Sequence, residues 1–123
     1  MEREATTFGE FLVEKRKQKG ISGRHLAKAL NVSPVYMCDM EKGRKACVTK
    51  EFIENVKRVF LLDEEETNRM HDLIAIARNS VSIDLPEYIM SNELVRTALR
   101  TAKKNNTPDE KWEKFIKEII REE

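Results

Sequence analysis

The chain has 123 residues, of which 40% are hydrophobic and 37% charged, and its net charge is +1. This length suits one compact domain, or a small domain with an added oligomerisation element. Because only four glycines and three prolines interrupt it, the composition favours helices over a turn-rich β fold. Two cysteines and two histidines are too few for a disulfide framework or a zinc site, so we expect no metal and no cofactor.

Charge is distributed unequally between the two halves of the chain. Residues 1–60 contain 13 Lys/Arg and 8 Asp/Glu, a net +5, whereas residues 61–123 contain 10 and 14, a net −4. One interpretation is an anionic partner for the first half, and the other is that helical surfaces are simply charged. The first residues lack an apolar signal segment and no run is long enough for a membrane span, so we expect a cytoplasmic protein that does not contact membranes.

Helical periodicity runs through the first part of the chain. We predict a helix over residues 7–19 and a second helix capped by Ser22. A third helix begins at Ser33-Pro34, where a capping serine precedes proline at the first helical position, and Gly43 ends it.

Two more helices follow, which gives five up to about Ser80. Thr49 caps the fourth, and the acidic residues 63–66 are typical of the first turn of the fifth, where negative charge is stabilised. The residues that we expect the fifth helix to bury are Met70, Leu73, Ile74 and Ala77.

The periodicity breaks at residues 79–86, which we interpret as a linker. A sixth helix follows, with apolar residues from Leu94 to Ala102. Residues 107–110, Thr-Pro-Asp-Glu, are typical of a capping box with proline at the first helical position and predict the start of a seventh helix. We therefore predict a first domain over residues 1–80 and a helical extension over residues 81–123.

The segment 21–45, ISGRHLAKALNVSPVYMCDMEKGRK, contains two short helices separated by the three-residue turn 31–33. Such a turn needs a residue that tolerates positive φ, and Asn31 is the second choice after glycine. The two helices can cross closely only where the contact residue is small, as Ala27 is. The residues expected to fill the space between them are Leu26, Leu30, Val32, Met37 and Met40. A rigid helix that presents its opposite face outward fits the DNA major groove.

These residues resemble the Cro/C1-type (XRE) helix-turn-helix transcriptional regulators over about residues 8–62. The resemblance is carried by Ile21-Ser22, Leu26-Ala27, Leu30, Asn31-Val32-Ser33, Tyr36, Met37, Met40, Glu41 and Gly43, with the basic stretch Lys42 to Lys45. It implies an all-α fold: a five-helix lambda-repressor-like DNA-binding domain with a C-terminal two-helix extension. It also implies a sequence-specific regulator of transcription, a repressor, that binds double-stranded DNA and is not an enzyme. The absence of a Gly-rich phosphate loop or nucleophile motif agrees with this.

The resemblance further implies which residues contact DNA. Those expected at base edges are Pro34, Val35, Tyr36 and Asp39. Those expected at phosphates are Ser22, Gly23, Arg24, Ser33, Lys42, Arg44 and Lys45. Helix-start amides attract phosphate, and lysines neutralise it without selecting a base. Many members of the family have Gln or Arg where this chain has Gly23, Val35 and Asp39. The resemblance therefore implies how this chain docks on DNA and does not imply which bases it prefers.

Other charged residues of this region have a structural interpretation. A carboxylate near phosphates is repelled, so we interpret Glu41 as a structural residue. We interpret the basic cluster of residues 15–19 as a solvated face rather than a DNA contact.

An apolar stripe in the extension needs a partner surface. The candidate interface residues are Leu94, Leu99, Trp112, Phe115, Ile116 and Ile119. The partner is the sixth helix of the same chain, a second protomer or a different protein. Two functional classes remain open: a homodimeric repressor on a palindromic operator, and an antitoxin or immunity-type adaptor that autoregulates its operon and binds a partner protein through its C-terminal helices. We expect a homodimer whose interface includes residues 85–120; the competing arrangement dimerises through the fifth helix.

Overall fold

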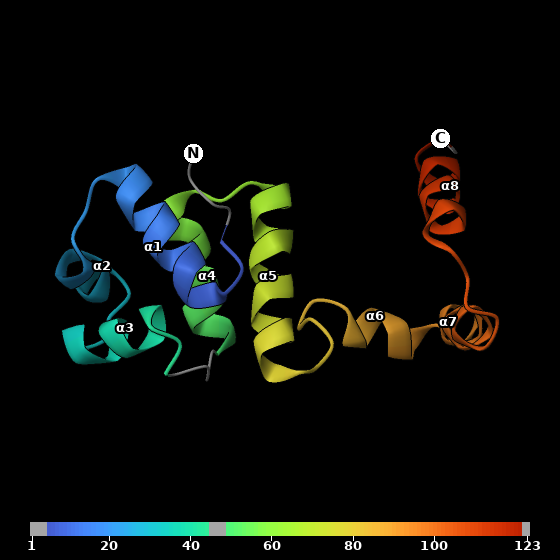
Figure 1. Cartoon of the computed structure of the whole chain (residues 1–123), viewed down its shortest axis with the longest axis horizontal. Helices are drawn as coiled ribbons and strands as arrows, with labels where there is room; N and C mark the ends of the chain where they lie inside the picture. Colours follow the sequence, from blue (N-terminus) through green and yellow to red (C-terminus); the bar gives the residue numbers. More distant parts are fainter. Residues whose placement is uncertain (1–4, 45–48, 122–123) are drawn as a thin grey trace. The chain divides into compact units, whose positions relative to one another are not determined.

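The computed structural model of the chain describes residues 5–44 and 49–121 (Figure 1). These residues form eight helices and no strand, which confirms the predicted all-α fold class. The chain divides into two compact units, Met1–Asp84 (unit 1) and Leu85–Glu123 (unit 2). None of the described helices combines the length and apolar character that crossing a bilayer requires.

Unit 1 contains five helices arranged around the first of them. They are α1 (Phe8–Lys19), α2 (Gly23–Ala29), α3 (Pro34–Glu41), α4 (Lys50–Phe60) and α5 (Glu64–Arg78). Helix α1 packs against each of the other four (Figure 1). It therefore occupies the centre of the unit, and the other helices are positioned through it.

The core of unit 1 draws on all five helices. Its largest fully buried side chains are Phe11, Leu12, Leu26, Met37, Met40, Met70 and Val56. The phenyl ring of Phe8 stacks on that of Phe11 and meets Phe52 edge-on, each at 6.4 Å between ring centroids. The predicted burial is wrong for Ala77, which is exposed, because α5 turns Ala75 inward instead.

Each helix of unit 1 begins at a side chain that accepts a backbone N–H. The capping residues are Thr7, Ser22, Ser33, Thr49 and Asp63. At the start of α5 the contact is reciprocal, because Glu66 also accepts the N–H of Asp63. The caps predicted at Ser22, Ser33 and Thr49 are thus confirmed.

Six helices end in one common motif. A residue with positive φ donates its N–H to the carbonyl three residues back, and the next N–H donates to the carbonyl five residues back. This is the Schellman arrangement, which satisfies carbonyls that the helix leaves free. The positive-φ residues are Gly20, Asn31, Gly43, Leu61, Asn79 and Asn106. Asn31, with φ of 59°, adopts the conformation predicted for it.

Helix α1 crosses the last turn of α3 at Gly9. A Cβ atom on Gly9 would lie 2.5 Å from the carbonyl oxygens of both Met40 and Glu41. Since no real Cβ contact is that short, this crossing requires glycine, although glycine lowers helix propensity.

Two ion pairs join α1 to α5. The guanidinium of Arg69 lies 3.0 and 3.3 Å from the two carboxylate oxygens of Glu14 and 5.4 Å from the ring centroid of Phe11. The ammonium of Lys15, a buried side chain, pairs with Glu66. The predicted solvated face is therefore wrong for Lys15, which is buried and whose ammonium lies 5.6 Å from the ring centroid of Phe11.

These contacts lower the pKa of both carboxylates. The hydrogen bond from Arg69 is the main cause for Glu14 and outweighs the opposing effect of burial. The hydrogen bond from Lys15 is the main cause for Glu66, and the backbone N–H of Asp63 adds to it.

Unit 2 contains α6 (Pro86–Ser91), α7 (Glu93–Lys104) and α8 (Asp109–Arg121). The prediction of two helices after Ser80 is wrong, because α6 begins with Pro86 at its first position and packs on α7. Arg96 holds this corner together by donating to the carbonyls of Ile89 and Met90. No described side chain of unit 2 is buried.

The Gly9 crossing generates a test of stability. Gly9→Ala places a methyl group against two backbone carbonyls, so we expect the free energy of unfolding to fall by about 2 kcal/mol, the usual range for overpacking. Urea denaturation measures the change. The matched control is Gly23→Ala, where the nearest atom to the new Cβ is Arg16 Nε at 3.9 Å, and it should unfold like the parent. Equal stability of all three proteins would contradict the close approach.

The lowered pKa of Glu14 generates a second test. A carboxylate with a depressed pKa stabilises the fold above its unfolded-state pKa, and this contribution is lost as the pH falls through the folded-state pKa. Glu14→Gln should therefore cost about 1 kcal/mol at pH 7 and nothing once the carboxylate is protonated. Urea unfolding at a series of pH values should show a shallower pH slope for this variant. Asp72→Asn, an exposed change on α5, should keep the parental slope.

Candidate nucleic-acid interface

Helices α2 and α3 form a compact pair joined by a very short turn. Helix α2 ends at Ala29, Asn31 takes the left-handed conformation, and the N–H of Val32 donates to the carbonyl of Ala27 at 2.9 Å. Ser33 then caps α3 at once. The Val32 side chain is half-buried against the core, as a hydrophobic residue at this position of the motif commonly is.

An ion pair with α1 anchors the far end of α3. Arg16 donates from Nε and Nη2 to the two carboxylate oxygens of Glu41 at 3.0 and 3.2 Å. The same guanidinium donates to the carbonyl of Ile21 at 3.3 Å, just before α2. The interpretation of Glu41 as structural is confirmed, and the solvated-face interpretation is wrong for Arg16. One arginine thus ties together α1, the start of α2 and the end of α3.

The outer face of α3 exposes some of the predicted base-contacting residues more than others. Pro34 is exposed and Val35 is 72% exposed. Tyr36 is half-buried and packs against the core. The first turn of α3 is therefore the part of this face that is most exposed to solvent.

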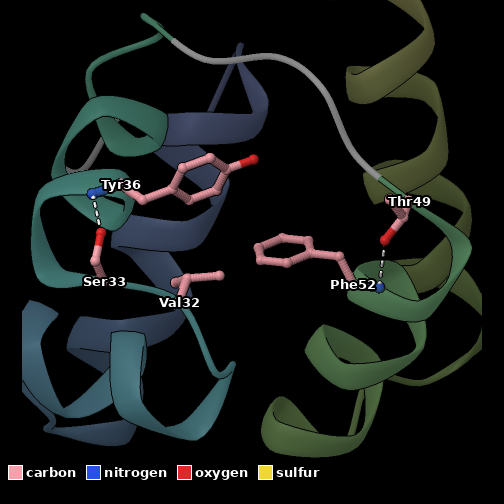
Figure 2. A pocket seen from close by; sticks show the side chains of 5 residues that line it. All are labelled: Val32, Ser33, Tyr36, Thr49 and Phe52. Carbon is pink, nitrogen blue, oxygen red and sulfur yellow. Dashed lines mark hydrogen bonds between the residues drawn. The ribbon is translucent and has the colours of Figure 1, made fainter.

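Tyr36 borders a pocket of about 310 Å³ between α3 and α4. Figure 2 shows its ring and the Phe52 ring directed toward each other from α3 and α4, with Val32 beside them. Because Phe52 belongs to α4, a helical register within α3 alone does not predict this pocket. The hydroxyls of Ser33 and Thr49, which also line the pocket, accept the N–H groups of Tyr36 and Phe52 (Figure 2).

Asp39, the fourth predicted base-contacting residue, is paired. Its carboxylate lies 3.4 Å from Nη1 of Arg44, and the two side chains are 25% and 66% exposed. Arg44, a predicted phosphate-contacting residue, thus offsets the negative charge of Asp39, the one acidic residue among the predicted base-contacting residues. The pair is open to solvent, so it can exchange partners at little cost.

Three cations on the segments before and after α3 have no acidic partner among the described residues. Arg24 and Lys28 on α2 and Lys42 after α3 are exposed, and none makes an ion pair with any described residue. Arg24, His25 and Lys28 line an open depression of about 820 Å³ that extends to Pro34. Lys28 is not among the predicted phosphate-contacting residues, although its spacing of four from Arg24 places both on one helical face.

The remaining predicted phosphate-contacting residues have local roles. The Ser22 and Ser33 hydroxyls accept the N–H groups of His25 and Tyr36, each at 3.0 Å, and both serines are exposed. Gly23 is half-buried at the first position of α2. Lys45 lies outside the described residues. Among the residues that the structure describes, no three His, Cys, Asp or Glu side chains gather as metal ligands would.

The Arg16–Glu41 pair generates a test of how α3 is held. Each side chain is less than one-fifth exposed, so Glu41→Ala leaves a guanidinium with little water around it. We expect a loss of about 2 kcal/mol in the free energy of unfolding. Arg16→Ala and the double variant complete a double-mutant cycle, with an expected coupling above about 1 kcal/mol. Asp39→Ala breaks the solvent-exposed pair on the same helix and should cost less than about 1 kcal/mol. A coupling near zero would mean that the pair does not hold α3.

No protein-family model, curated protein or solved structure matches this chain. A functional assignment therefore rests on what the α2–α3 pair can do chemically. It presents an exposed, uncharged helix start on α3, with the unpaired cations Arg24, Lys28 and Lys42 on the segments beside it. Such a surface suits a polyanion with apolar and hydrogen-bonding groups between its charges.

Proposed function

We propose that this chain is a sequence-specific regulator of transcription, a repressor, that binds double-stranded DNA with α3 in the major groove. The observation that carries the proposal is the exposed first turn of α3, with Arg24 and Lys28 around the depression that reaches Pro34 and Lys42 just after the end of the helix. None of these three cations pairs with a described acidic residue. The major groove admits one α-helix, and base edges within it can be distinguished by side chains. The resemblance of segment 21–45 to XRE regulators supports the same docking mode.

The exposed start of α3 is the main part of the protein that discriminates between bases. Val35 offers only an apolar surface, which fits the methyl group of thymine. Asp39 can accept from the amino group of cytosine, and Arg44 beside it offsets the repulsion between this carboxylate and phosphates. Tyr36 contributes through the part of its ring that the core leaves uncovered.

The residues that bind phosphates are Arg24 and Lys28 on α2 and Lys42 and Arg44 after α3. These side chains neutralise backbone charge without selecting a base, and they fix the position of α3 on the duplex. The acidic residues Glu41 and Asp39 are already paired with Arg16 and Arg44, and Arg24, Lys28 and Lys42 pair with no described residue, so their positive charge is available to DNA.

A single α3 reads only a few base pairs, which gives poor discrimination against a genome of competing sites. The proposal therefore includes a homodimer on a palindromic operator. In that arrangement the two α3 helices are separated by about 34 Å, one turn of DNA.

A second candidate function is supported by unit 2. Its described side chains are all at least partly exposed, including Leu94, Leu99, Phe115, Ile116 and Ile119. An antitoxin or immunity-type adaptor would cover these residues with a different protein while unit 1 autoregulates the operon. A stoichiometric complex with the product of the adjacent gene, lost on Phe115→Asp, would support this function.

The phosphate assignment is tested through salt dependence. A duplex selected from a random pool and a scrambled duplex serve as probes in fluorescence anisotropy titrations. Lys42→Ala should weaken binding to both duplexes alike and reduce the slope of log affinity against log salt by about 1, because one phosphate contact is lost. Lys57→Ala, a cation on α4 that is near Glu54, should leave the slope unchanged. A parent protein that binds both duplexes equally would contradict sequence-specific recognition.

The base-edge assignment predicts the opposite pattern for Val35→Ala. Truncating a groove contact should reduce the preference for the selected duplex by roughly tenfold, with little effect on the scrambled one. The same titrations measure both affinities. An equal effect on the two duplexes would place Val35 outside the groove.

A further inference from the structure

Helix α8 exposes an apolar stripe that no described part of the chain covers. Phe115, Ile116, Ile119 and Ile120 are each half or more exposed. Trp112, half-buried, extends the stripe and meets Phe115 edge-on, with 6.3 Å between ring centroids. Contiguous apolar surface of this kind marks an interaction site on a water-exposed protein.

The charged residues beside the stripe differ between its two edges. With 3.6 residues per turn, Glu113 and Lys117 follow one edge, four positions apart. Lys111 and Glu118 follow the other edge, seven positions apart. All four side chains are exposed. Each edge thus has one acidic and one basic residue, in opposite order along the helix.

We propose that α8 pairs with α8 of a second copy of this chain in an antiparallel arrangement with Phe115 at the two-fold axis. In such a pair, positions at equal distance before and after Phe115 face each other along the same edge. Glu113, two positions before Phe115, then faces Lys117 of the second copy, and the two-fold axis repeats this contact. On the other edge, Lys111 faces Glu118 of the second copy in nearly the same register.

The charge pattern favours a second copy as the partner. In a parallel pair, opposite edges meet, so Glu113 lies two positions from Lys111 of the partner helix and Lys117 lies one position from Glu118. Only the antiparallel pair brings Glu113 and Lys117 of the two copies to the same level, and only in that pair does mixing two charge-reversed variants restore opposite charges. A second copy in the antiparallel direction satisfies all four edge residues at once. This interface lies entirely in unit 2 and does not depend on DNA binding by unit 1.

Charge reversal tests the pairing directly. Glu113→Lys and Lys117→Glu each place like charges opposite each other twice in the dimer, so each dissociation constant should rise roughly tenfold or more. An equimolar mixture of the two variants should associate as tightly as the parent, because both ammonium groups on this edge of the Glu113→Lys chain then face carboxylates of the Lys117→Glu chain. Sedimentation equilibrium of the full chain measures the mass, which should be about twice 14.4 kDa for the parent.

The mixing step separates this pairing from an effect within one helix. Each single variant also places like charges four positions apart on α8, which weakens the helix slightly, but mixing cannot relieve that contact. Lys114→Glu makes the same charge change on the polar face, opposite to the stripe, and should associate like the parent. Circular dichroism checks that helicity is retained in every variant.

The competing interfaces give distinct results. Phe115→Asp should make the chain monomeric, whereas Ile76→Asp, at a side chain of α5 that is 72% exposed, should not. A parent that is monomeric, variants that associate normally, a mixture that gains nothing, or dissociation by Ile76→Asp alone would each overturn the proposal. Because none of these measurements includes DNA, they do not depend on the duplex-binding titrations.

Discussion

The approach of α1 to the last turn of α3 determines much of unit 1. At Gly9 the two backbones are so close that no side chain fits between them, and this contact sets the distance between the two helices. One helical turn further along α1, Leu12 is completely buried, and Arg16 then reaches Glu41. Since α3 is only eight residues long, a contact at its end and the tight turn at its beginning leave it little freedom. The helix that we place in DNA is therefore positioned by the core at its end and by the short turn at its beginning.

Charge contributes to this architecture from within as well as at the surface. The consecutive residues Glu14, Lys15 and Arg16 of α1 each pair with a different helical residue, two on α5 and one on α3. Partly buried pairs of this kind are costly to break because the remaining charge loses its partner. Part of the positive charge of residues 1–60 is thus neutralised inside the unit, and the exposed cations that pair with no described acidic residue include Arg24 and Lys28 on α2 and Lys42 after α3.

The sequence predicts what depends on neighbours in the chain. Caps such as Ser22 and Ser33 and the turn residue Asn31 act over three to five positions, so the helices and their starts follow from local patterns. Gly9 was missed because its role appears only when α3 lies against it. Likewise, Tyr36 shares a pocket with Phe52, which comes from another helix. Helix α6 is too short for periodicity, and the interaction that ends it comes from Arg96, in the next helix.

The common way in which the helices end also bears on how fast this chain can fold. A Schellman turn closes a loop of only a few residues, so forming the α2–α3 pair costs little chain entropy. The hydrogen bonds of this turn can form as soon as two helical turns exist. The same is true of the packing of Val32 against the core. The crossing of Gly9 with Met40 joins positions far apart in sequence and must wait for that pair. We therefore expect the local pair to form first and α1 to dock second, since proteins dominated by such local contacts fold within microseconds to milliseconds.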